Sequence, residues 1–281
     1  MGLLHKGEVI NSIYKVNVFI NEGCFGEVYS VTHKYFGIQI LKILKQEYTQ
    51  SVDMQVVINE AKNLSKLSHD NIVRVFDINK IKKYDKEFYY LTMGFVHGES
   101  LKDLLKRSFN LDYETSLTFQ LDVLNGLNLA HSKNIIHRDI KPDNILISYE
   151  NTQKAMLSDF GLSQDLNQYN SSIGDSAGSY VYSAPECFSG IYLKSSDVFS
   201  IGMVFYKMLT GTLPWKIEYS NNTDQMIDNV FIGRKEKIIN PSFYNKDIPS
   251  RINDIVLKSL SLKIENRFKD SKEFLDNLKI K

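Results

Sequence analysis

Cysteine is scarce in this sequence, and its scarcity excludes two classes of protein. The 281 residues include only two cysteines, Cys24 and Cys187, which are too few for a disulfide framework. No group of cysteines and histidines has the spacing of a zinc site. Prolines number only five, and the first residues lack the small-residue cleavage site of a secretory signal. The expected compartment is therefore the reducing cytoplasm.

Long apolar runs are also missing. A membrane-spanning helix needs about 18 or more apolar residues in succession. The longest candidate, near 201–208, is interrupted by Gly202 and Lys207. At the start of the chain, Lys6 stands where a myristoylation motif has Ser or Thr. No membrane partner is expected.

An excess of charge of either sign is absent as well. The 34 Lys and Arg residues face 33 Asp and Glu residues, so the formal net charge is +1. A general nucleic-acid-binding protein needs a basic face that releases counterions, and no nucleic-acid partner is expected. Aromatic residues are abundant, with 16 Phe and 16 Tyr, which is enough apolar surface to exclude intrinsic disorder.

The first third of the chain has the patterns of strands. Tyr14, Val16 and Val18 alternate with polar positions, which is the period of a half-buried strand. Apolar residues spaced by three and four predict one helix over 54–64. Further strands are predicted over 28–31, 38–44, 72–76 and 88–95. This part therefore suggests a small sheet that carries one helix.

After residue 98 the periodicity becomes helical. Helical faces are predicted from Leu117 to Leu127, from Val198 to Met208, and again between Ile255 and Leu278. We find no internal repeat. A β-rich lobe joined by a short hinge to a helical lobe is an α+β fold.

Two glycines and a lysine in the β-rich part are candidates for phosphate binding. Segment 21–28, NEGCFGEV, is a turn in which Gly23 and Gly26 let backbone N–H groups approach a phosphate. An ordinary hairpin explains the same glycines. Lys42 lies in an apolar strand, where it is costly unless it meets an anion such as Glu60. A solvated lysine at a strand edge is the alternative.

Two segments in the helical part carry the strongest signal. Segment 137–144 reads HRDIKPDN, and segment 158–161 reads SDFG, with Asp159 placed 20 residues after Asp139. These segments resemble the catalytic and metal-binding loops of the protein kinase family. The resemblance covers essentially the whole chain. It implies a single two-lobed protein kinase domain over 1–281, with an N-lobe over 1–93, a hinge over 94–98 and a C-lobe over 99–281.

Other positions extend the resemblance. Gly23, Gly26 and Val28 match the loop that covers the phosphates, Lys42 the lysine of the third strand, and Glu60 its helix partner. Segment 184–186, APE, matches the end of an activation segment that opens at Asp159. Segment 197–202 resembles the central helix of the large lobe, and Arg267 occupies the place of the arginine that pairs with Glu186.

The resemblance implies transfer of the γ-phosphate of ATP to Ser or Thr hydroxyls of proteins, including the chain itself. Asp139 is implied to accept the hydroxyl proton and aim the hydroxyl, while Lys141, braced by Ser179, neutralises the γ-phosphate. Lys42, oriented by Glu60, is implied to hold the α and β phosphates. The implied Mg²⁺ ligands are Asn144 and Asp159.

The implied adenine site combines side chains and hinge backbone. Met93 stands at the gate of the pocket, Gly94, Phe95 and Val96 lie along the hinge, and Ser100 takes the ribose position. The residues implied to sandwich the ring are Ile20, Val28, Ile40 and Leu146. His137 is interpreted as a packing residue, stacked with Leu64, Val75 and Phe160, because Asp139 takes the role of proton acceptor.

Two positions depart from the family pattern. Asn21 replaces the first glycine of the phosphate loop, and asparagine tolerates the positive φ that such a turn can need. Ile40 stands where the family mostly has Ala, which narrows the nucleotide slot and could weaken ATP affinity.

The sequence leaves three functions open. The first is an active serine/threonine kinase. The second is a pseudokinase, a scaffold or nucleotide-sensing module in which Ile40 and Asn21 block productive binding. The third is a small-molecule kinase, against which Lys141 and segment 184–186 argue. No pattern in the sequence sets an oligomeric state.

The loop that begins at Asp159 suggests regulation by phosphate. Ser171, Ser172 and Ser176 are candidate autophosphorylation sites, with Asp175 as a constitutive substitute that pairs with Arg138. A solvated loop without such a role is the alternative.

Overall fold

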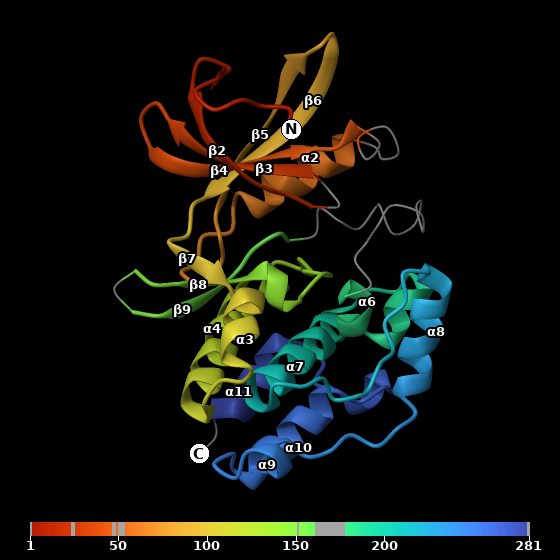
Figure 1. Cartoon of the computed structure of the whole chain (residues 1–281). Coiled ribbons are helices and arrows are strands. Elements are labelled where there is room, and N and C mark those ends of the chain that lie inside the picture. The colour runs from red at the N-terminus through yellow and green to blue at the C-terminus, as the bar shows by residue number, and fades with distance from the viewer. Residues whose placement is uncertain are drawn as a thin grey trace. The chain divides into compact units, whose positions relative to one another are not determined.

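The structure is a computed structural model that describes residues 2–23, 26–46, 49, 54–150, 152–160 and 178–279, without the side chains of Val56 and Glu60. The described residues form two compact units, one before and one after the bond between Val96 and His97 (Figure 1). The first unit is mainly sheet and the second mainly helix, which confirms the predicted α+β class. No described helix is long and apolar enough to cross a membrane.

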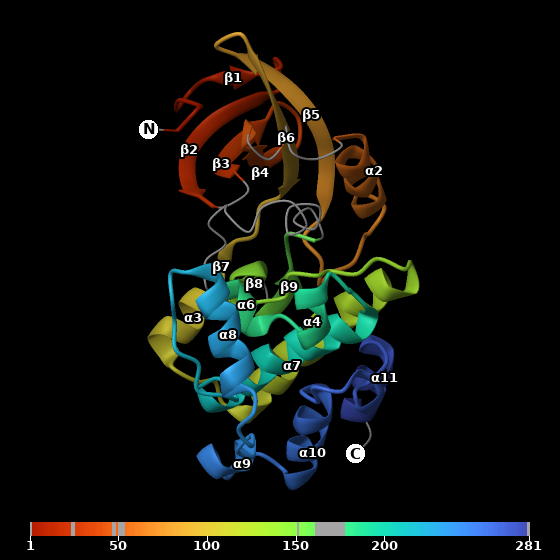
Figure 2. The same cartoon turned by 90° about the vertical axis from the view of Figure 1, so that its right-hand side faces the viewer.

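The described part of the first unit is a six-stranded antiparallel sheet that carries helix α2. Its strands lie in the order β1-β2-β3-β4-β6-β5. The elements are β1 (Val9–Ile10), β2 (Tyr14–Glu22), β3 (Gly26–His33), β4 (Gly37–Leu44), α2 (Met54–Leu64), β5 (Val75–Lys83) and β6 (Lys86–Gly94). Helix α2 runs alongside β5, as both views show (Figures 1 and 2).

One face of this sheet packs into a hydrophobic core. Alternate residues of the central strands point into it, as a period of two requires, and Leu4 from the segment before β1 joins them. The buried members are Leu4, Ile10, Tyr14, Val16, Tyr29, Val31, Leu41, Ile43, Ile81 and Tyr90. The segment before β1 thus contributes Leu4 to the packing of the first unit.

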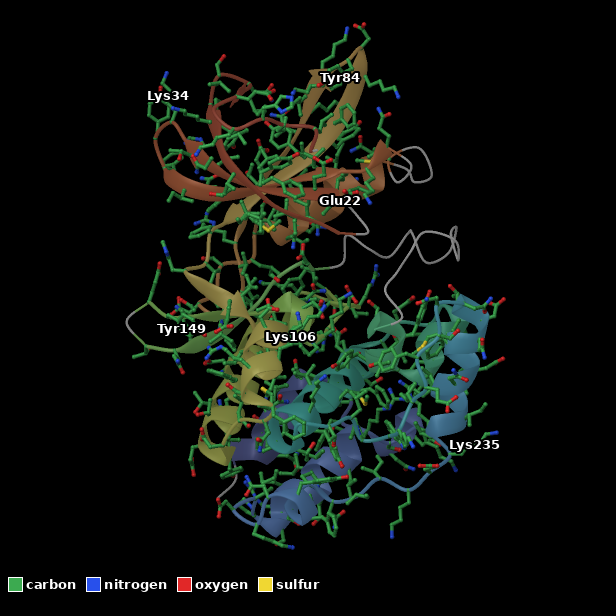
Figure 3. All side chains as sticks on the ribbon, in the orientation of Figure 1. Glu22, Lys34, Tyr84, Lys106, Tyr149 and Lys235 are labelled. Carbon is green, nitrogen blue, oxygen red and sulfur yellow. The ribbon has the colours of Figure 1, made fainter. Side chains whose placement is uncertain are left out.

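The β5–β6 hairpin forms without a glycine. Its two-residue turn consists of Tyr84 and Asp85, with φ angles of 48° and 59°, the left-handed region that a tight hairpin of this kind needs. Tyr84 is exposed at the tip (Figure 3).

The strand predicted over 72–76 is misplaced. Ile72 and Val73 are buried in the connection between α2 and β5, so their apolar character reflects packing outside a strand. The strand itself begins at Val75 and is exposed along most of its length, because it lies at the edge of the sheet. An edge strand with polar side chains on its open face has a weak apolar period.

The second unit combines a helical bundle with a small sheet in the order β7-β8-β9. The sheet and the helices up to η2 are β7 (Gly98–Ser100), α3 (Leu101–Ser108), α4 (Tyr113–Ser132), η1 (Pro142–Asn144), β8 (Ile145–Ser148), β9 (Lys154–Leu157), α6 (Gly178–Tyr182) and η2 (Pro185–Ser189). The remaining elements are α7 (Lys194–Thr210), α8 (Thr223–Gly233), α9 (Pro241–Tyr244), α10 (Ser250–Ser259), η3 (Ile264–Asn266) and α11 (Ser271–Lys279).

Helix α7 is the centre of the bundle. It packs against α4, α6, α9, α10 and α11, and side chains on all of its faces are buried (Figures 1 and 2). The sequence predicted only one apolar face, from Val198 to Met208. A helix surrounded by others buries its small polar residues too, among them Ser195, Ser196 and Ser200.

Candidate functional site

An aspartate, a lysine and a serine of the second unit are in direct contact. Lys141 Nζ lies 2.9 Å from Asp139 Oδ2 and donates a hydrogen bond of 2.7 Å to Ser179 Oγ. Asn144 Nδ2 donates to the backbone carbonyl and to Oδ2 of Asp139, each at 2.8 Å. Both side chains of the Asp139–Lys141 pair are mostly buried, with exposed fractions of 20% and 13%. Charged groups held this way are pre-oriented for chemistry.

The backbone before Asp139 is held by a buried carboxylate. Asp197, in the first turn of α7, accepts from the backbone N–H of His137 at 2.7 Å and of Arg138 at 2.8 Å. Its Oδ2 also lies 2.9 Å from His131 Nε2. Arg138 has a φ of 74°, a conformation that costs a residue with a side chain about 1–3 kcal/mol. Asp197 therefore fixes a strained loop directly before Asp139.

His137 is a packing residue in this geometry. Its ring is fully buried and lies 4.4 Å, centroid to centroid, from the ring of Phe160. Nε2 donates to the carbonyl of Ser158 at 2.9 Å. Burial lowers the pKa of His137 despite the nearby carboxylates of Asp197 and Asp139. The ring is neutral, and the expected contact with Phe160 is present.

Two oxygen-bearing residues lie at adjacent strand ends. Asn144 directly precedes β8 and Asp159 follows β9, and these strands pair with Ile145 opposite Leu157. The backbone N–H of Ser158 donates to the carbonyl of Asn144 at 2.9 Å, which closes this end of the ladder. The two residues therefore leave neighbouring strands at the same end.

This pair fits a hard cation. The two hydrogen bonds of the Asn144 side chain to Asp139 both use its nitrogen, so the amide oxygen is the atom that a cation would take. Among the described residues, no group of three His, Cys, Asp or Glu is arranged to enclose a metal. Magnesium suits such an open site, because it is usually held by one or two protein oxygens together with phosphate and water.

In the first unit, the sheet register places four predicted residues on one face. Val28 lies opposite Lys42, and Ile40 lies opposite Met93. Ile40 and Lys42 are two residues apart in β4, so all four side chains point to the same side. This is the opposite face from Leu41 and Ile43, which enter the hydrophobic core.

The turn between β2 and β3 depends on one glycine more than on the other. A Cβ on Gly26 would lie 1.7 Å from the carbonyl oxygen of Ile43, so only glycine fits beside β4. Gly23 has no such close neighbour. Asn21 is paired in β2 opposite Val28 and is not among the positive-φ residues. The turn therefore does not use the positive φ that asparagine would tolerate at position 21.

Three more predicted nucleotide residues, Ile20, Gly94 and Val96, lie in the first unit. The backbone N–H of Gly94 donates to the carbonyl of Arg74 at 2.9 Å, so this N–H is already used within the first unit. Val96 is half-buried at the end of that unit, and Ile20 in β2 is 46% exposed.

Ser100 and Leu146 lie opposite each other in β7 and β8. Ser100 is the N-cap of α3, where its hydroxyl accepts from the backbone N–H of Asp103 at 3.1 Å and donates to Asp103 Oδ2 at 2.7 Å. The structure thus gives Ser100 a capping contact that the sequence did not predict, although serine is a preferred N-cap residue.

A buried ion pair joins η2 to the end of the bundle. Arg267 Nη1 and Nη2 bind Glu186 Oε1 and Oε2 at 2.7 and 2.8 Å, which confirms the expected pairing. Ser196 also donates to Oε1 at 2.7 Å. Burial by itself would raise the pKa of Glu186, but the hydrogen bonds from Arg267 and Ser196 outweigh it, and the pKa is lowered.

Two contacts near the site were missed by the sequence. Asp143 forms an ion pair of 2.5 Å with Lys102 of α3, so the exposed acid beside the catalytic segment already has a cation of its own chain. Arg234, at the end of α8, is buried and donates to two carbonyls of the segment around α6. Neither the Asp143–Lys102 pair nor Arg234 belongs to a motif with a characteristic spacing, so the sequence does not indicate these contacts.

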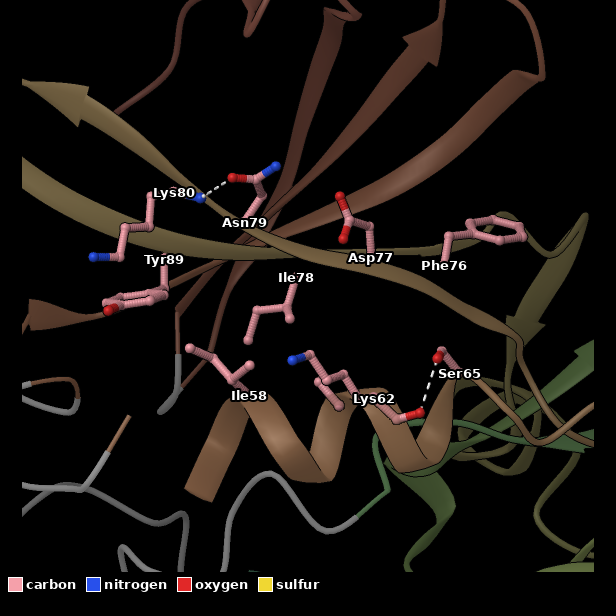
Figure 4. A pocket seen from close by; sticks show the side chains of 10 residues that line it. Ile58, Lys62, Ser65, Phe76, Asp77, Ile78, Asn79, Lys80 and Tyr89 are labelled. Carbon is pink, nitrogen blue, oxygen red and sulfur yellow. Dashed lines mark hydrogen bonds between the residues drawn. The ribbon is translucent and has the colours of Figure 1, made fainter. Parts of the chain in front are cut away.

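A groove of about 320 Å³ separates α2 from β5 and β6 (Figure 4). Ile58 and Lys62 reach into it from α2, opposite Ile78 and Tyr89 of the strands. None of the predicted site residues lines this groove.

Some predictions fall outside the described residues. These are the Glu60 side chain, Gly161, and the loop residues Ser171, Ser172, Asp175 and Ser176. The pairing of Lys42 with Glu60 and the role of the loop serines therefore stay predictions.

Comparisons with known proteins agree on one family. The sequence pattern of the family described as "Protein kinase domain" matches residues 14–276. The protein named "Probable serine/threonine-protein kinase CPE1738" of Clostridium perfringens is 31% identical over 276 residues, which are 97% of this chain and 38% of that protein. Serine/threonine-protein kinase PknB of Mycobacterium tuberculosis is 30% identical over 223 residues, 78% of this chain and 34% of that protein.

Solved structures give the same result for the fold. The crystal structure of the Mycobacterium tuberculosis PknI kinase domain matches with a TM-score of 0.74 and 22% identity, over 98% of each chain. The present chain spans about two fifths of the length of several curated relatives that it matches.

Proposed function

Because the chain belongs to the protein kinase domain family, we propose that it transfers the γ-phosphate of ATP to Ser or Thr hydroxyls of protein substrates, including its own. The observation that carries this proposal is the contact of Lys141 with both Asp139 and Ser179. A carboxylate beside a fixed ammonium provides an acceptor for a hydroxyl proton and a cation for the phosphate that the hydroxyl attacks.

The roles of the second unit's residues follow from their chemistry. Asp139 orients the acceptor hydroxyl and takes its proton, and Asn144 holds Asp139 through two hydrogen bonds. Lys141 offsets the charge that develops on the transferred phosphoryl group. Asn144 and Asp159 would hold Mg²⁺, which neutralises phosphate charge when bound.

We propose that ATP is bound by the predicted set of residues. Lys42 contacts the α and β phosphates and is oriented by Glu60, and the backbone of Gly23 and Gly26 covers the phosphates. The residues proposed to contact adenosine are Ile20, Val28, Ile40, Met93, Gly94, Val96, Ser100 and Leu146. The division into an N-lobe over 1–93, a hinge over 94–98 and a C-lobe over 99–281 is part of the same proposal, as is the expected cytoplasmic location.

No observation favours a scaffold or a small-molecule kinase. Ile40 lies on the same sheet face as Lys42, but every charged or amide group of the proposed reaction is present in the sequence. The activity therefore remains the better proposal.

Incubation with labelled ATP and Mg²⁺ tests the proposal. The acceptors are a generic basic protein and a peptide library, and the Asp159→Ala variant is the blank. We expect label on Ser and Thr that depends on Asp159. If the wild-type protein labels no acceptor but still binds ATP and Mg²⁺ in a thermal-shift assay, the result would support a scaffold instead.

A further inference from the structure

Arg234 is a buried arginine at the end of α8. Its side chain is 3% exposed, and its guanidinium carbon lies 4.9 Å from the ring of Phe199, 5.7 Å from Trp215 and 5.9 Å from Phe188. Nη2 donates to the carbonyls of Val181 and Ser183 at 3.0 and 2.7 Å. A cation that stacks on aromatic faces and bonds two backbone carbonyls is fixed in one orientation.

The burial of this side chain is unfavourable for the stability of the fold. Among the described residues, Arg234 forms no ion pair, and its Nε and Nη1 have no hydrogen-bond partner there. Burial, together with the neighbouring charge of Arg267, lowers the pKa of Arg234 to about 9. The side chain is still charged at neutral pH. A buried cation without a carboxylate is unfavourable for stability, so stability alone does not explain it.

The two carbonyls that Arg234 binds belong to a segment in contact with the catalytic pair. Val181 lies in α6 and Ser183 directly follows it. A five-residue helix leaves its last carbonyls without helical partners, and Arg234 supplies the missing donors. Ser179, in the first turn of the same helix, accepts the hydrogen bond from Lys141. The position of α6 therefore affects the surroundings of Lys141 and Asp139.

We propose that Arg234 is a positioning residue for the protein acceptor: by holding the carbonyls of Val181 and Ser183, it fixes the surface beside Asp139 along which the acceptor chain lies. This inference rests on the proposed function. An acceptor whose hydroxyl reaches Asp139 places its next residues, about 3.3–3.6 Å apart, beside α6 and the segment after it. Arg234 touches neither ATP nor the acceptor and acts through the backbone of that segment.

The test replaces Arg234 by methionine, which fills similar space between the three rings but donates no hydrogen bonds. We expect the peptide KM of Arg234→Met to rise by about tenfold or more, since small displacements of a bound reactant are costly. The KM for ATP and the rate of ATP hydrolysis without acceptor are expected to stay within about twofold.

Arg251→Met is the matched control. Arg251 also donates to two backbone carbonyls, those of Asn277 and Leu278 at 3.2 Å each, but these lie on α11. Its loss is expected to leave the peptide KM unchanged. A peptide KM of Arg234→Met equal to that of Arg251→Met would overturn the inference, and so would an equal rise in the KM values for peptide and ATP.

A second variant keeps the inference testable if Arg234→Met does not fold. Arg234→Lys keeps the charge but lacks the planar fork, and we expect at least a threefold higher peptide KM with an unchanged KM for ATP. A wild-type peptide KM in this variant overturns the inference. A wild-type protein that phosphorylates no acceptor contradicts the proposed function instead, so the two failures are distinguishable.

Discussion

The carboxylate of Asp197 accepts a hydrogen bond from the backbone N–H of Arg138 at 2.8 Å, and Arg138 is a residue whose φ is positive. The two residues are 59 positions apart in the sequence. The central helix of the second unit thereby imposes a strained conformation on the loop that ends at Asp139. Site geometry in this unit depends on a residue that does not touch the reacting groups.

Asp197→Asn is expected to lower both stability and activity. The amide nitrogen of Asn would face a backbone N–H, so at least one buried donor loses its acceptor, at about 2–4 kcal/mol. The loop at Arg138 would relax, and displacement of Asp139 is expected to lower kcat by about 10²-fold. Urea unfolding and a rate assay measure the two effects. Asp276→Asn, in an exposed pair with Lys272, is the control, and an unfolding midpoint equal to that control would contradict the assignment.

Asp139→Asn is expected to stop transfer while ATP still binds. The carboxylate acts on the acceptor hydroxyl, and positioned acid–base groups contribute about 10²–10⁴ in rate. Titration calorimetry gives the ATP affinity and a peptide assay gives kcat. Asp143→Asn is the neighbouring control, because Asp143 faces Lys102 and not Lys141. A variant that keeps more than a tenth of wild-type turnover would remove the proposed role.

Much of the fold follows from local patterns, and the exceptions have physical causes. The stripe from Met54 to Leu64 gives α2, because one face of this helix is apolar. The alternation predicted from Tyr14 describes only the start of β2, where Tyr14 and Val16 are buried; Val18 is exposed beyond a shift in the pairing register. The strand at 72–76 was misplaced because Ile72 and Val73 are buried outside any strand. An apolar run records burial and not the backbone conformation that achieves it.

The candidate site also contains residues that the sequence indicates and residues that it does not. Asp139, Lys141, Asn144 and Asp159 stand in segments whose residue types and spacing are specific, so the sequence could single them out as candidates. Arg234 has no such signal, since its contacts are to carbonyls of residues 51 and 53 positions away. Every residue has a backbone carbonyl, so a side chain that binds carbonyls requires no particular residue type in its partner and leaves no pattern in the sequence.

Lys102→Ala is expected to change substrate preference. Asp143 is an exposed acid within the catalytic segment, where it could meet a basic residue of the substrate, but Lys102 pairs with it at 2.5 Å. Removal of that cation leaves an exposed carboxylate, which is expected to raise the preference for Arg or Lys before the acceptor residue by about two- to fivefold. Stability should change by less than about 1 kcal/mol, as for most exposed pairs.

A peptide library profiled with both proteins measures this change. Lys106→Ala is the matched control, because Lys106 pairs with Asp103 one turn further along α3. Identical profiles for Lys102→Ala and Lys106→Ala would show that Asp143 does not meet the substrate.

Glu186→Gln is expected to reveal a pH-dependent contribution to stability. The pKa of Glu186 is lowered in the folded protein, so the unfolded chain binds more protons at this site. The stabilisation is therefore present above the ordinary carboxyl pKa of about 4.5 and is lost as the pH falls through the lower folded value. At pH 7 the variant should be less stable by about 3–5 kcal/mol, because Arg267 is left buried without its carboxylate. The gap between the two unfolding free energies should begin to narrow as the pH falls below about 4.5 and should close only below the lowered folded pKa, whereas Glu265→Gln, at an exposed position, should differ little from wild type at either pH. A gap between wild type and Glu186→Gln that stays constant from pH 7 to pH 3.5 would mean that the ionised pair with Arg267 does not stabilise the fold.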